Sequence, residues 1–397
     1  MRGATSAYLG FAAYGLFWGT WGAALPALRD SAAVDESALG IALLFVGAGA
    51  LPAMLLVGRA VDRFGSRIGG VLLILLAVSG VTIAAIAHDL LGLIIGMTLV
   101  GASSGAADVA INAQAGLVEQ RSGRRVITVA HGVFSASVVL GSAGAGGLRS
   151  LGFGPEAVFL VAGAALAIAG VVVMMTGDRA HRASAETPHP HVRPLWWIPF
   201  VAVGLVGALG FAIENAHQSW SAIFVGDVLG ADPAVTALAP ATFALFAAAT
   251  RFTVGALPRL SPRMLLIGGA ALAAAGTLLV STASTVPMAI GGLALAAIGT
   301  AVLYPTLLSE ATRDVAPAQR GRATSAMTAI SYIGFILGPV YVGLLSTFAG
   351  MRGSMVGVAA LAVIFAVLAP LLLARRNRVS SARLESAAIN PLANTSE

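Results

Sequence analysis

The feature that most constrains this chain is a succession of apolar segments, each about as long as a lipid bilayer is thick. A helix needs about 20 mostly apolar residues to cross the hydrocarbon, and twelve such segments can be counted between clusters of arginine, proline and glycine. They show no alternation at every second residue, so they are expected to be helices, which satisfy their own backbone groups in lipid. The expected spans are residues 8–28, 37–57, 68–87, 90–117, 126–148, 155–176, 195–222, 233–257, 264–283, 287–309, 323–347 and 354–374. The sequence therefore predicts an all-α polytopic membrane protein with twelve transmembrane helices.

Composition excludes most other classes of protein. Only 10% of the residues are charged and 58% are hydrophobic, whereas a soluble domain carries roughly 25% charged residues. A soluble enzyme, a nucleic-acid-binding module and a disordered chain are therefore excluded. The net charge of +6 does not indicate a nucleic-acid partner, because the arginines lie in short segments between the spans. The chain has no cysteine, and we expect no metal, no cofactor and no catalytic residues.

The arginines predict the orientation. All 23 basic residues are arginine, and 20 of them fall on one side of the predicted spans. Cytoplasmic loops carry the excess of basic residues in membrane proteins. Both termini are therefore expected in the cytoplasm.

The chain divides into two similar halves. We expect an N-terminal six-helix half at residues 1–176, a cytoplasmic central loop at 177–194, a C-terminal six-helix half at 195–374 and a cytoplasmic tail at 375–397. The halves correspond at an offset near 197 residues, as the pairs Arg125 and Arg322, Gly141 and Gly338, and Gly146 and Gly343 show. Such parallel repeats are typical of transporters whose substrate site lies between the halves at mid-depth. The sequence thus predicts a central cavity, although gene duplication alone could leave the same symmetry.

A charged, glycine-bearing stretch follows the second predicted span. The segment GRAVDRFGSR begins at Gly58 and ends at Arg67. Gly58 and Gly65 allow a tight turn, and the Asp62 carboxylate can accept charge-assisted bonds from an arginine or a helix N-terminus. With Arg63, these residues are candidates for a latch that joins the halves in one conformational state. The alternative is a solvated basic turn.

This segment resembles the loop signature of the major facilitator superfamily, G-x-x-x-D-R-x-G-x-[RK], at Gly58, Asp62, Arg63, Gly65 and Arg67. The twelve spans, the central loop and the repeat extend the resemblance over the whole chain. The equivalent segment of the second half, residues 251–263, has no aspartate. The resemblance implies alternating access by rocking of the halves without ATP, in the bacterial cytoplasmic (inner) membrane, and the chain has no phosphate-binding loop motif.

A carboxylate lies inside the predicted fourth span. Asp108 shares a helical face with Ser104 and Asn112 at four-residue spacing. A carboxylate at mid-membrane costs about 2.5–3.5 kcal/mol on insertion scales, so it needs a function or a partner. Asp108 is a candidate proton carrier and Asn112 a candidate cavity residue. The alternative is a structural aspartate paired with an arginine.

The predicted seventh span carries a second polar stretch. Glu214, His217 and Gln218 share a helical face, and Trp220 follows. Lipid cannot satisfy these groups, so they must line water or a partner helix. Glu214 and His217 are further candidates for proton coupling, and Gln218 and Trp220 for the substrate cavity. The alternative is a hydrogen-bonded gate near the periplasmic end.

Aromatic residues mark two further helical faces. Tyr14, Trp18 and Trp21 follow helical spacing in the first span, and Tyr332 lies in the eleventh. Aromatic faces suit flat drugs or sugars, so these four side chains are candidate cavity residues. A packing stripe is the alternative.

Two resemblances within the superfamily favour different substrates. The spacing of Asp108 and Asn112 and the pair Trp220-Ser221 resemble the fucose-permease-like branch, which implies symport of a sugar or small polar metabolite with protons. The chain departs from that branch in two places. The branch resemblance implies an acid in the first helix, but residues Tyr8 to Leu28 contain none, and it implies an acid just before the tryptophan, where this chain has Ser219. The alternative is a proton-driven exporter of drugs or amphipathic metabolites, although the glycine-rich span 126–148 has no proline and Gly338-Pro339 lies in the eleventh span instead.

The remaining expectations concern the class and the partners. A solute sensor without flux is a less favoured alternative, and a membrane enzyme is disfavoured because the chain lacks H-E-x-x-H and cysteine. The expected partners are a small-molecule solute, protons and membrane lipids. We expect a functional monomer.

Overall fold

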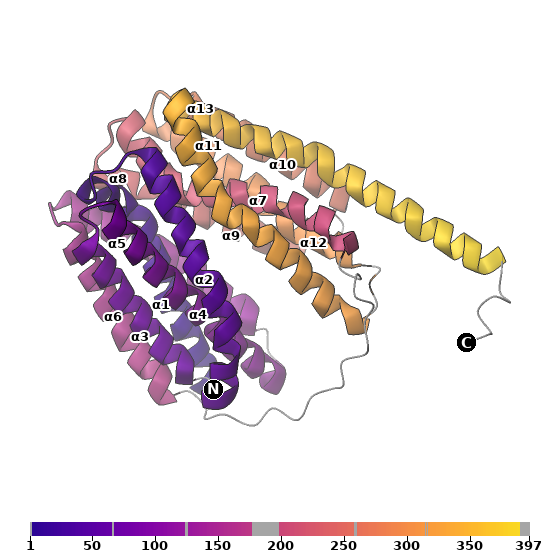
Figure 1. Ribbon diagram of the computed structural model, residues 1–397, viewed down its shortest axis with the longest axis horizontal. Helices are drawn as coiled ribbons and strands as arrows, with labels where there is room; N and C mark the ends of the chain where they lie inside the picture. The colour runs from indigo at the N-terminus through magenta and orange to yellow at the C-terminus, as the bar shows by residue number, and fades with distance from the viewer. Residues whose placement is uncertain are drawn as a thin grey trace.

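The computed structural model describes residues 2–65, 67–123, 126–176, 198–257, 260–313, 315 and 317–389, and these ranges contain helices and no strand (Figure 1). The helices of the first half are α1 (Arg2–Ser31), α2 (Glu36–Phe64), α3 (Arg67–Ile86), α4 (Leu90–Ser122), α5 (Val126–Ser150) and α6 (Pro155–Thr176). Those of the second half are α7 (Ile198–Ile223), η1 (Phe224–Val228), α8 (Pro233–Thr236), α9 (Leu238–Ala256), α10 (Pro262–Ser281), α11 (Val286–Thr300), α12 (Leu303–Thr312) and α13 (Pro317–Ile389).

Ten segments of the described chain are long and apolar enough to cross a membrane. One of them, Ala326–Ala374, has 49 residues, about twice the length that a single crossing needs. Its helix α13 is interrupted at Gly350, where φ is 65°, so this segment folds back as two helices. The 30-residue α1 is not among the ten, because its glycines and aromatic residues lower its hydropathy. An all-α polytopic fold is confirmed, and the count of twelve spans remains a prediction that these two observations favour.

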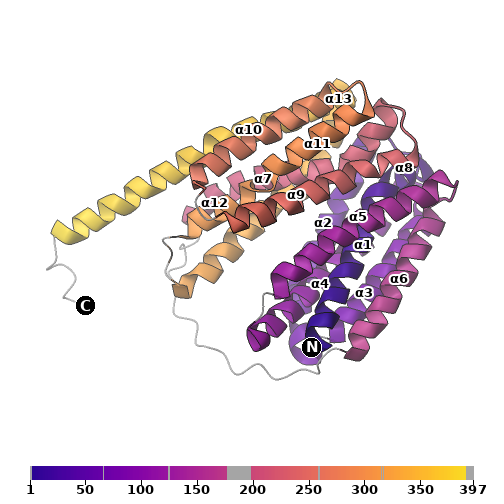
Figure 2. The same cartoon turned by 180° about the vertical axis from the view of Figure 1, so that it is seen from behind.

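The two halves meet at one end of the molecule and diverge at the other. Figures 1 and 2 show α1–α6 as one bundle and α7–α13 as a second, with the gap between them widening toward the end that carries the N-terminus. At the closed end α2 packs against α13, and α5 packs against α8 and α9. The arrangement is a V whose closed end lies where α1, α5 and α7 end.

The closed end contains two matching helix crossings. A methyl group added at Gly343 would lie 2.5 Å from the Glu36 carbonyl oxygen and 2.9 Å from the Gly40 Cα. One added at Gly146 would lie 2.5 Å from the Ala237 Cβ and 3.1 Å from a backbone oxygen of α8. Glycine is required at both positions because the backbones approach so closely. The repeat inferred from sequence therefore corresponds to a repeated contact between the halves.

Short polar caps position the helix ends. The side chains of Asp35, Asp89 and Asp232 accept hydrogen bonds from the first backbone N–H groups of α2, α4 and α8, the usual role of an N-cap aspartate. At the other end of α2, Gly65 ends the helix with φ 68°, which a β-carbon would disfavour.

Several predicted boundaries differ from the structure. The second span was expected to end at residue 57, but α2 continues to Phe64, so most of the predicted latch is helical. The tenth span was expected to be continuous, but it breaks at Ala301 and Val302 between α11 and α12. In the predicted tail the helix α13 continues to Ile389. The predicted central loop at 177–194 and residues 390–397 lie outside the described residues.

Candidate functional site: a cavity between the halves

A cavity of about 240 Å³ lies between the two halves. Its walls come from α1, α2, α4 and α5 on one side and from α7, α9 and α13 on the other. Six of the predicted site residues line it, namely Tyr14, Trp18, Trp21, Asp108, Gln218 and Tyr332. The structure thus brings together residues that are more than 300 positions apart in the sequence.

Asp108 is the one charged side chain among the described residues that line this cavity. Its neighbour Asn112, one turn further along α4, donates to the Asp108 carbonyl oxygen at 2.9 Å and to Oδ1 at 3.0 Å. Asn112 itself does not line the cavity, so it orients the carboxylate. No arginine lies within ion-pair distance of Asp108 in the described part of the chain. The structural alternative from sequence, an aspartate paired with arginine, therefore does not fit this geometry.

Aromatic rings cover the walls around Asp108. In α1 the Tyr14 hydroxyl is hydrogen-bonded to Ser104 Oγ at 2.9 Å, and its ring lies 5.8 Å from that of Phe134. The rings of Trp18 and Trp21 lie 6.0 Å apart and nearly perpendicular. From the opposite half, Tyr332 lies 5.4 Å from Phe335 between ring centres. The two tryptophans are both cavity residues and packing residues, because Trp21 also stacks on the buried Phe17.

Glu214 lies behind the cavity wall in an ion pair. The Arg251 guanidinium donates from Nη2 to both carboxylate oxygens of Glu214 at 2.8 Å. Gln218, which lines the cavity, donates to the same carboxylate at 3.3 Å. The Glu214 side chain is 14% exposed and that of Arg251 is 44% exposed. Arg251 opens the segment 251–263 that was compared with the signature loop, and it lies within α9.

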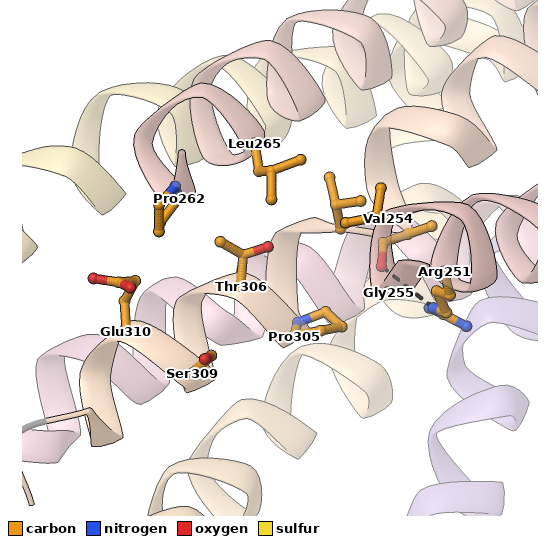
Figure 3. A pocket seen from close by; sticks show the side chains of 11 residues that line it. Arg251, Val254, Gly255, Pro262, Leu265, Pro305, Thr306, Ser309 and Glu310 are labelled. Carbon is orange, nitrogen blue, oxygen red and sulfur yellow. Dashed lines mark hydrogen bonds between the residues drawn. The ribbon is translucent and has the colours of Figure 1, made fainter. Parts of the chain in front are cut away.

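Arg251 also satisfies a backbone group at the break between α11 and α12. Pro305 has no N–H to donate to the carbonyl four residues earlier, which belongs to Ala301. Arg251 Nε donates to this oxygen at 3.3 Å, the contact shown dashed in Figure 3. These residues border a second pocket of about 480 Å³ among α9, α10 and α12, which also contains Thr306 and Glu310 (Figure 3).

A second proline also leaves a backbone carbonyl without its helical donor, and a side chain again supplies the missing hydrogen bond. Pro339 in α13 leaves the Phe335 carbonyl without its helical donor, and Asn215 of α7 donates to that oxygen. Asn215 was not among the residues selected from the sequence. Its signal was present, because a proline inside a predicted span always leaves a carbonyl that needs another donor.

The structure places His217 and Trp220 away from the cavity lining. His217 is 1% exposed, contacts Thr277 Oγ1 at 3.0 Å and stacks on Phe243 with 5.0 Å between ring centres. Trp220 is fully buried and donates from Nε1 to the Pro339 carbonyl at 3.2 Å. Helical spacing put His217 on the face of Glu214, but its ring points into the second half between α7, α9 and α10.

The closed end holds an ion-pair cluster that sequence reasoning missed. Arg29, at the end of α1, binds Asp227 of η1 across the two halves. The same guanidinium contacts Asp30 at 2.9 Å and Glu36 at 3.6 Å. The Arg29 side chain is only 12% exposed. Arg29 is one of the three arginines predicted on the outer side, and that exception to the charge bias was the available signal.

The predicted latch lies at the open end, where α2 ends and α3 begins. Gly58 is helical, and a β-carbon there would meet nothing within 4 Å, so no tight turn requires it. The Arg63 guanidinium lies 5.4 Å from the centre of the Phe64 ring. Arg67 is the first residue of α3, and the side chain of Asp62 is outside the described set. The latch remains a prediction.

The comparisons with known proteins agree with this architecture. The family model described as Major Facilitator Superfamily matches residues 7–257 and 203–394. Among curated proteins, the chain is 30% identical over 369 residues to an uncharacterized transporter, y4wD, of Sinorhizobium fredii (strain NBRC 101917 / NGR234), covering 91% of this chain and 96% of that protein.

Solved structures share the fold at low sequence identity. A bacterial homolog of the human lysosomal transporter Spinster, in an inward-facing and unoccupied conformation, aligns with a TM-score of 0.77 at 17% identity over 94% of this chain and 96% of that one. A D-xylose–proton symporter aligns with a TM-score of 0.72 at 16% identity over 92% and 96%. With the family model matching both halves of a helical, multi-pass membrane chain, the protein belongs to the major facilitator superfamily.

Proposed function

We propose that this transporter moves a small solute by alternating access and couples that movement to protons at Asp108. The observation that carries the proposal is the position of Asp108, which is the charged group lining the cavity between the halves in the described chain. A carboxylate in an apolar site is stabilised when a proton or a cation neutralises it. A group that exchanges its proton there links protonation to the state of the cavity.

The V-shaped arrangement supports the alternating-access part. The halves contact each other at one end through the Gly146 and Gly343 crossings and the Arg29–Asp227 ion pair. With both termini in the cytoplasm of the bacterial inner membrane, as the arginines predict, the open end faces inward. In the outward-facing state we expect the latch residues Asp62, Arg63 and Arg67 to contact the second half.

Asp108 is a better candidate for the proton site than Glu214 or His217. Arg251 already neutralises Glu214, and His217 is buried away from the cavity. We assign Glu214 to positioning Gln218 and Arg251. Of the substrate classes predicted from sequence, a small polar metabolite, whether neutral or protonated, is compatible with the amide and hydroxyl groups of the cavity. A D-xylose–proton symporter shares the fold.

A solute-independent experiment tests the proton step. The chain has no cysteine, so spin labels can be attached to Ser150→Cys and Ser284→Cys, two exposed positions in different halves at the closed end. We expect the distance distribution of the unsubstituted protein to shift between pH 5.5 and pH 7.5, and the Asp108→Asn variant to lose that shift. Glu310→Gln, which removes a carboxylate outside the cavity, is the matched control and should retain it. A shift that persists in Asp108→Asn would refute the assignment.

A further inference from the structure

The inference concerns the chemical class of the solute and rests on the cavity to which the proposed function assigns the proton. Six aromatic rings and one carboxylate line this cavity in the described chain. The rings belong to Tyr14, Trp18, Trp21, Phe134, Tyr332 and Phe335. Among the described residues of this lining there is no arginine and no histidine.

The Asp108 carboxylate keeps one oxygen available. Asn112 donates to Oδ1, and no hydrogen bond to Oδ2 is made by the residues that the structure describes. The bond to Oδ1 comes from the same helix one turn away, so it holds the carboxylate in place without neutralising its charge. Oδ2 is therefore free to bind a positively charged donor.

Within the described part of the chain, the elements around the cavity add no compensating charge. Tyr14 of α1 and Tyr332 of α13 are the titratable groups that face Asp108 from neighbouring helices in the described structure, and both are neutral phenols at ordinary pH. The stretches of α2 and α5 that line the cavity contribute apolar and hydroxyl side chains. The Glu214–Arg251 pair behind the wall has no net charge. A cation in the cavity therefore meets one negative charge and several ring faces.

Carboxylates and aromatic faces both attract cations. A cation within about 6 Å of a ring centre gains roughly 0.5–2 kcal/mol from the ring quadrupole, most when it is desolvated. A neutral solute forgoes this attraction, and an anion is repelled by Asp108. A solute with a protonated amine and a carbon skeleton therefore matches both kinds of group that the cavity offers.

We propose that the solute is an organic monocation whose protonated or quaternary nitrogen binds Asp108 Oδ2 while its carbon skeleton lies against the aromatic rings. The cation and the coupling proton then occupy the same carboxylate in turn. Exchange of one for the other at a single site drives the solute and the proton in opposite directions. The cation therefore leaves the cell as protons enter.

Matched pairs of probes test the charge requirement directly. Choline and 3,3-dimethylbutan-1-ol have the same shape with and without charge, glucosamine and glucose form a polar pair, and phenethylamine and 2-phenylethanol form an aromatic pair. Binding is measured on the purified full-length protein at pH 6.5 by thermal stabilisation and by tryptophan fluorescence, to which Trp18 and Trp21 of the cavity contribute. We expect at least one cation to bind about tenfold more tightly than its neutral partner.

Variants test whether Asp108 is responsible for the preference for cations. Asp108→Asn should reduce it to within about twofold, whereas Asp108→Glu should retain it and shows that the site tolerates substitution. Glu310→Gln is the matched control and should leave the preference unchanged. The inference is overturned by neutral probes that bind as tightly as cations, by a preference that survives Asp108→Asn, or by the absence of binding for all three cations at millimolar concentration.

The spin-label experiment separates this inference from the proposed function. Loss of the pH-dependent shift in Asp108→Asn together with preferred binding of neutral probes would leave the proton site standing and refute the cation. A pH-dependent shift that persists in Asp108→Asn together with an Asp108-dependent cation preference would leave the cation site standing and refute the proton role.

Discussion

The two walls of the cavity treat their buried polar groups differently. The wall from the first half presents Asp108, whose carboxylate is bonded only by Asn112 of its own helix among the described residues. In the second half, three polar side chains of α7, at or behind the wall, have a partner on another helix. There Glu214 binds Arg251, Asn215 binds the Phe335 carbonyl, and His217 contacts Thr277.

This difference distinguishes a group that can bind and release a ligand or a proton from groups that stabilise the structure. A charge that is paired on its own protein has little to gain from a solute or a proton, and removing its partner leaves an uncompensated charge. A charge without a partner gains from any cation that enters. We infer that the first half supplies the group that reacts to ligand and proton, while the second half supplies a fixed surface.

The largest effect is expected at Asp108, the carboxylate that is unpaired among the described residues, and not at the paired Glu214. Asp108→Asn should abolish proton-driven accumulation in proteoliposomes, while movement of solute down its gradient persists at concentrations high enough to offset the weaker binding. Its thermal stability should stay within about 0.5 kcal/mol of the parent protein, because asparagine keeps the shape and leaves no partner unpaired. Accumulation is measured with the first compound that stabilises the purified protein at pH 5.5 and pH 7.5.

Removing the partner of Glu214 should instead lower stability. Arg251→Gln leaves Glu214 unpaired at 14% exposure, and we expect a loss of about 2 kcal/mol, less than for a fully buried pair because Arg251 is partly exposed. The double variant Glu214→Gln and Arg251→Gln should recover about half of this loss. A double variant as unstable as the single one would show that packing, and not charge, is responsible.

A smaller effect is expected at the proline in α13. Asn215→Ala should cost about 1–2 kcal/mol, because the buried Phe335 carbonyl loses its donor. In the Pro339→Ala background the helix regains an N–H at position 339, so the same substitution should cost less. Thermal unfolding of the four proteins in a double-mutant cycle measures this coupling, and equal costs in both backgrounds would contradict the explanation.

The smallest effect is expected at the Arg29–Asp227 ion pair, which connects the two halves at the closed end. Arg29→Gln should weaken the closed end by about 1 kcal/mol and enrich the long-distance population between labels at Ser150→Cys and Ser284→Cys. Asp227→Asn should act in the same direction, because it removes the partner of Arg29 in the second half. Unchanged label distances in both variants would show that the glycine crossings alone close this end.

Much of the fold follows from the sequence for simple physical reasons. Hydrocarbon thickness fixes the length of a span, and arginine placement and the 197-residue offset give the division into halves. Boundaries were less predictable where capping decided them, as at Gly65, which ends α2 seven residues beyond the expected position. The break between α11 and α12 was also missed, although Pro305 marks it.

The residues of the candidate site could largely be predicted from the sequence, but the side chains with which they interact could not. Helical spacing identified Asp108, Trp18 and Gln218, since polar and aromatic groups inside a span must face something other than lipid. Spacing could not determine whether Glu214 faces the cavity or an arginine, because the partner comes from a helix 37 positions later. It also misplaced His217, whose ring direction depends on packing between three helices.

The two crossings at the closed end are related by exchange of the halves. Gly146 of the first half meets Ala237 of the second, and Gly343 of the second meets Gly40 of the first, with 197 residues separating each residue from its counterpart. In an isologous contact, as in a two-fold homodimer, both partners use the same surface, so each residue pair across the contact occurs twice with the partners exchanged. The joint between the halves therefore has the geometry of an association between two copies of one six-helix ancestor, now carried on a single polypeptide.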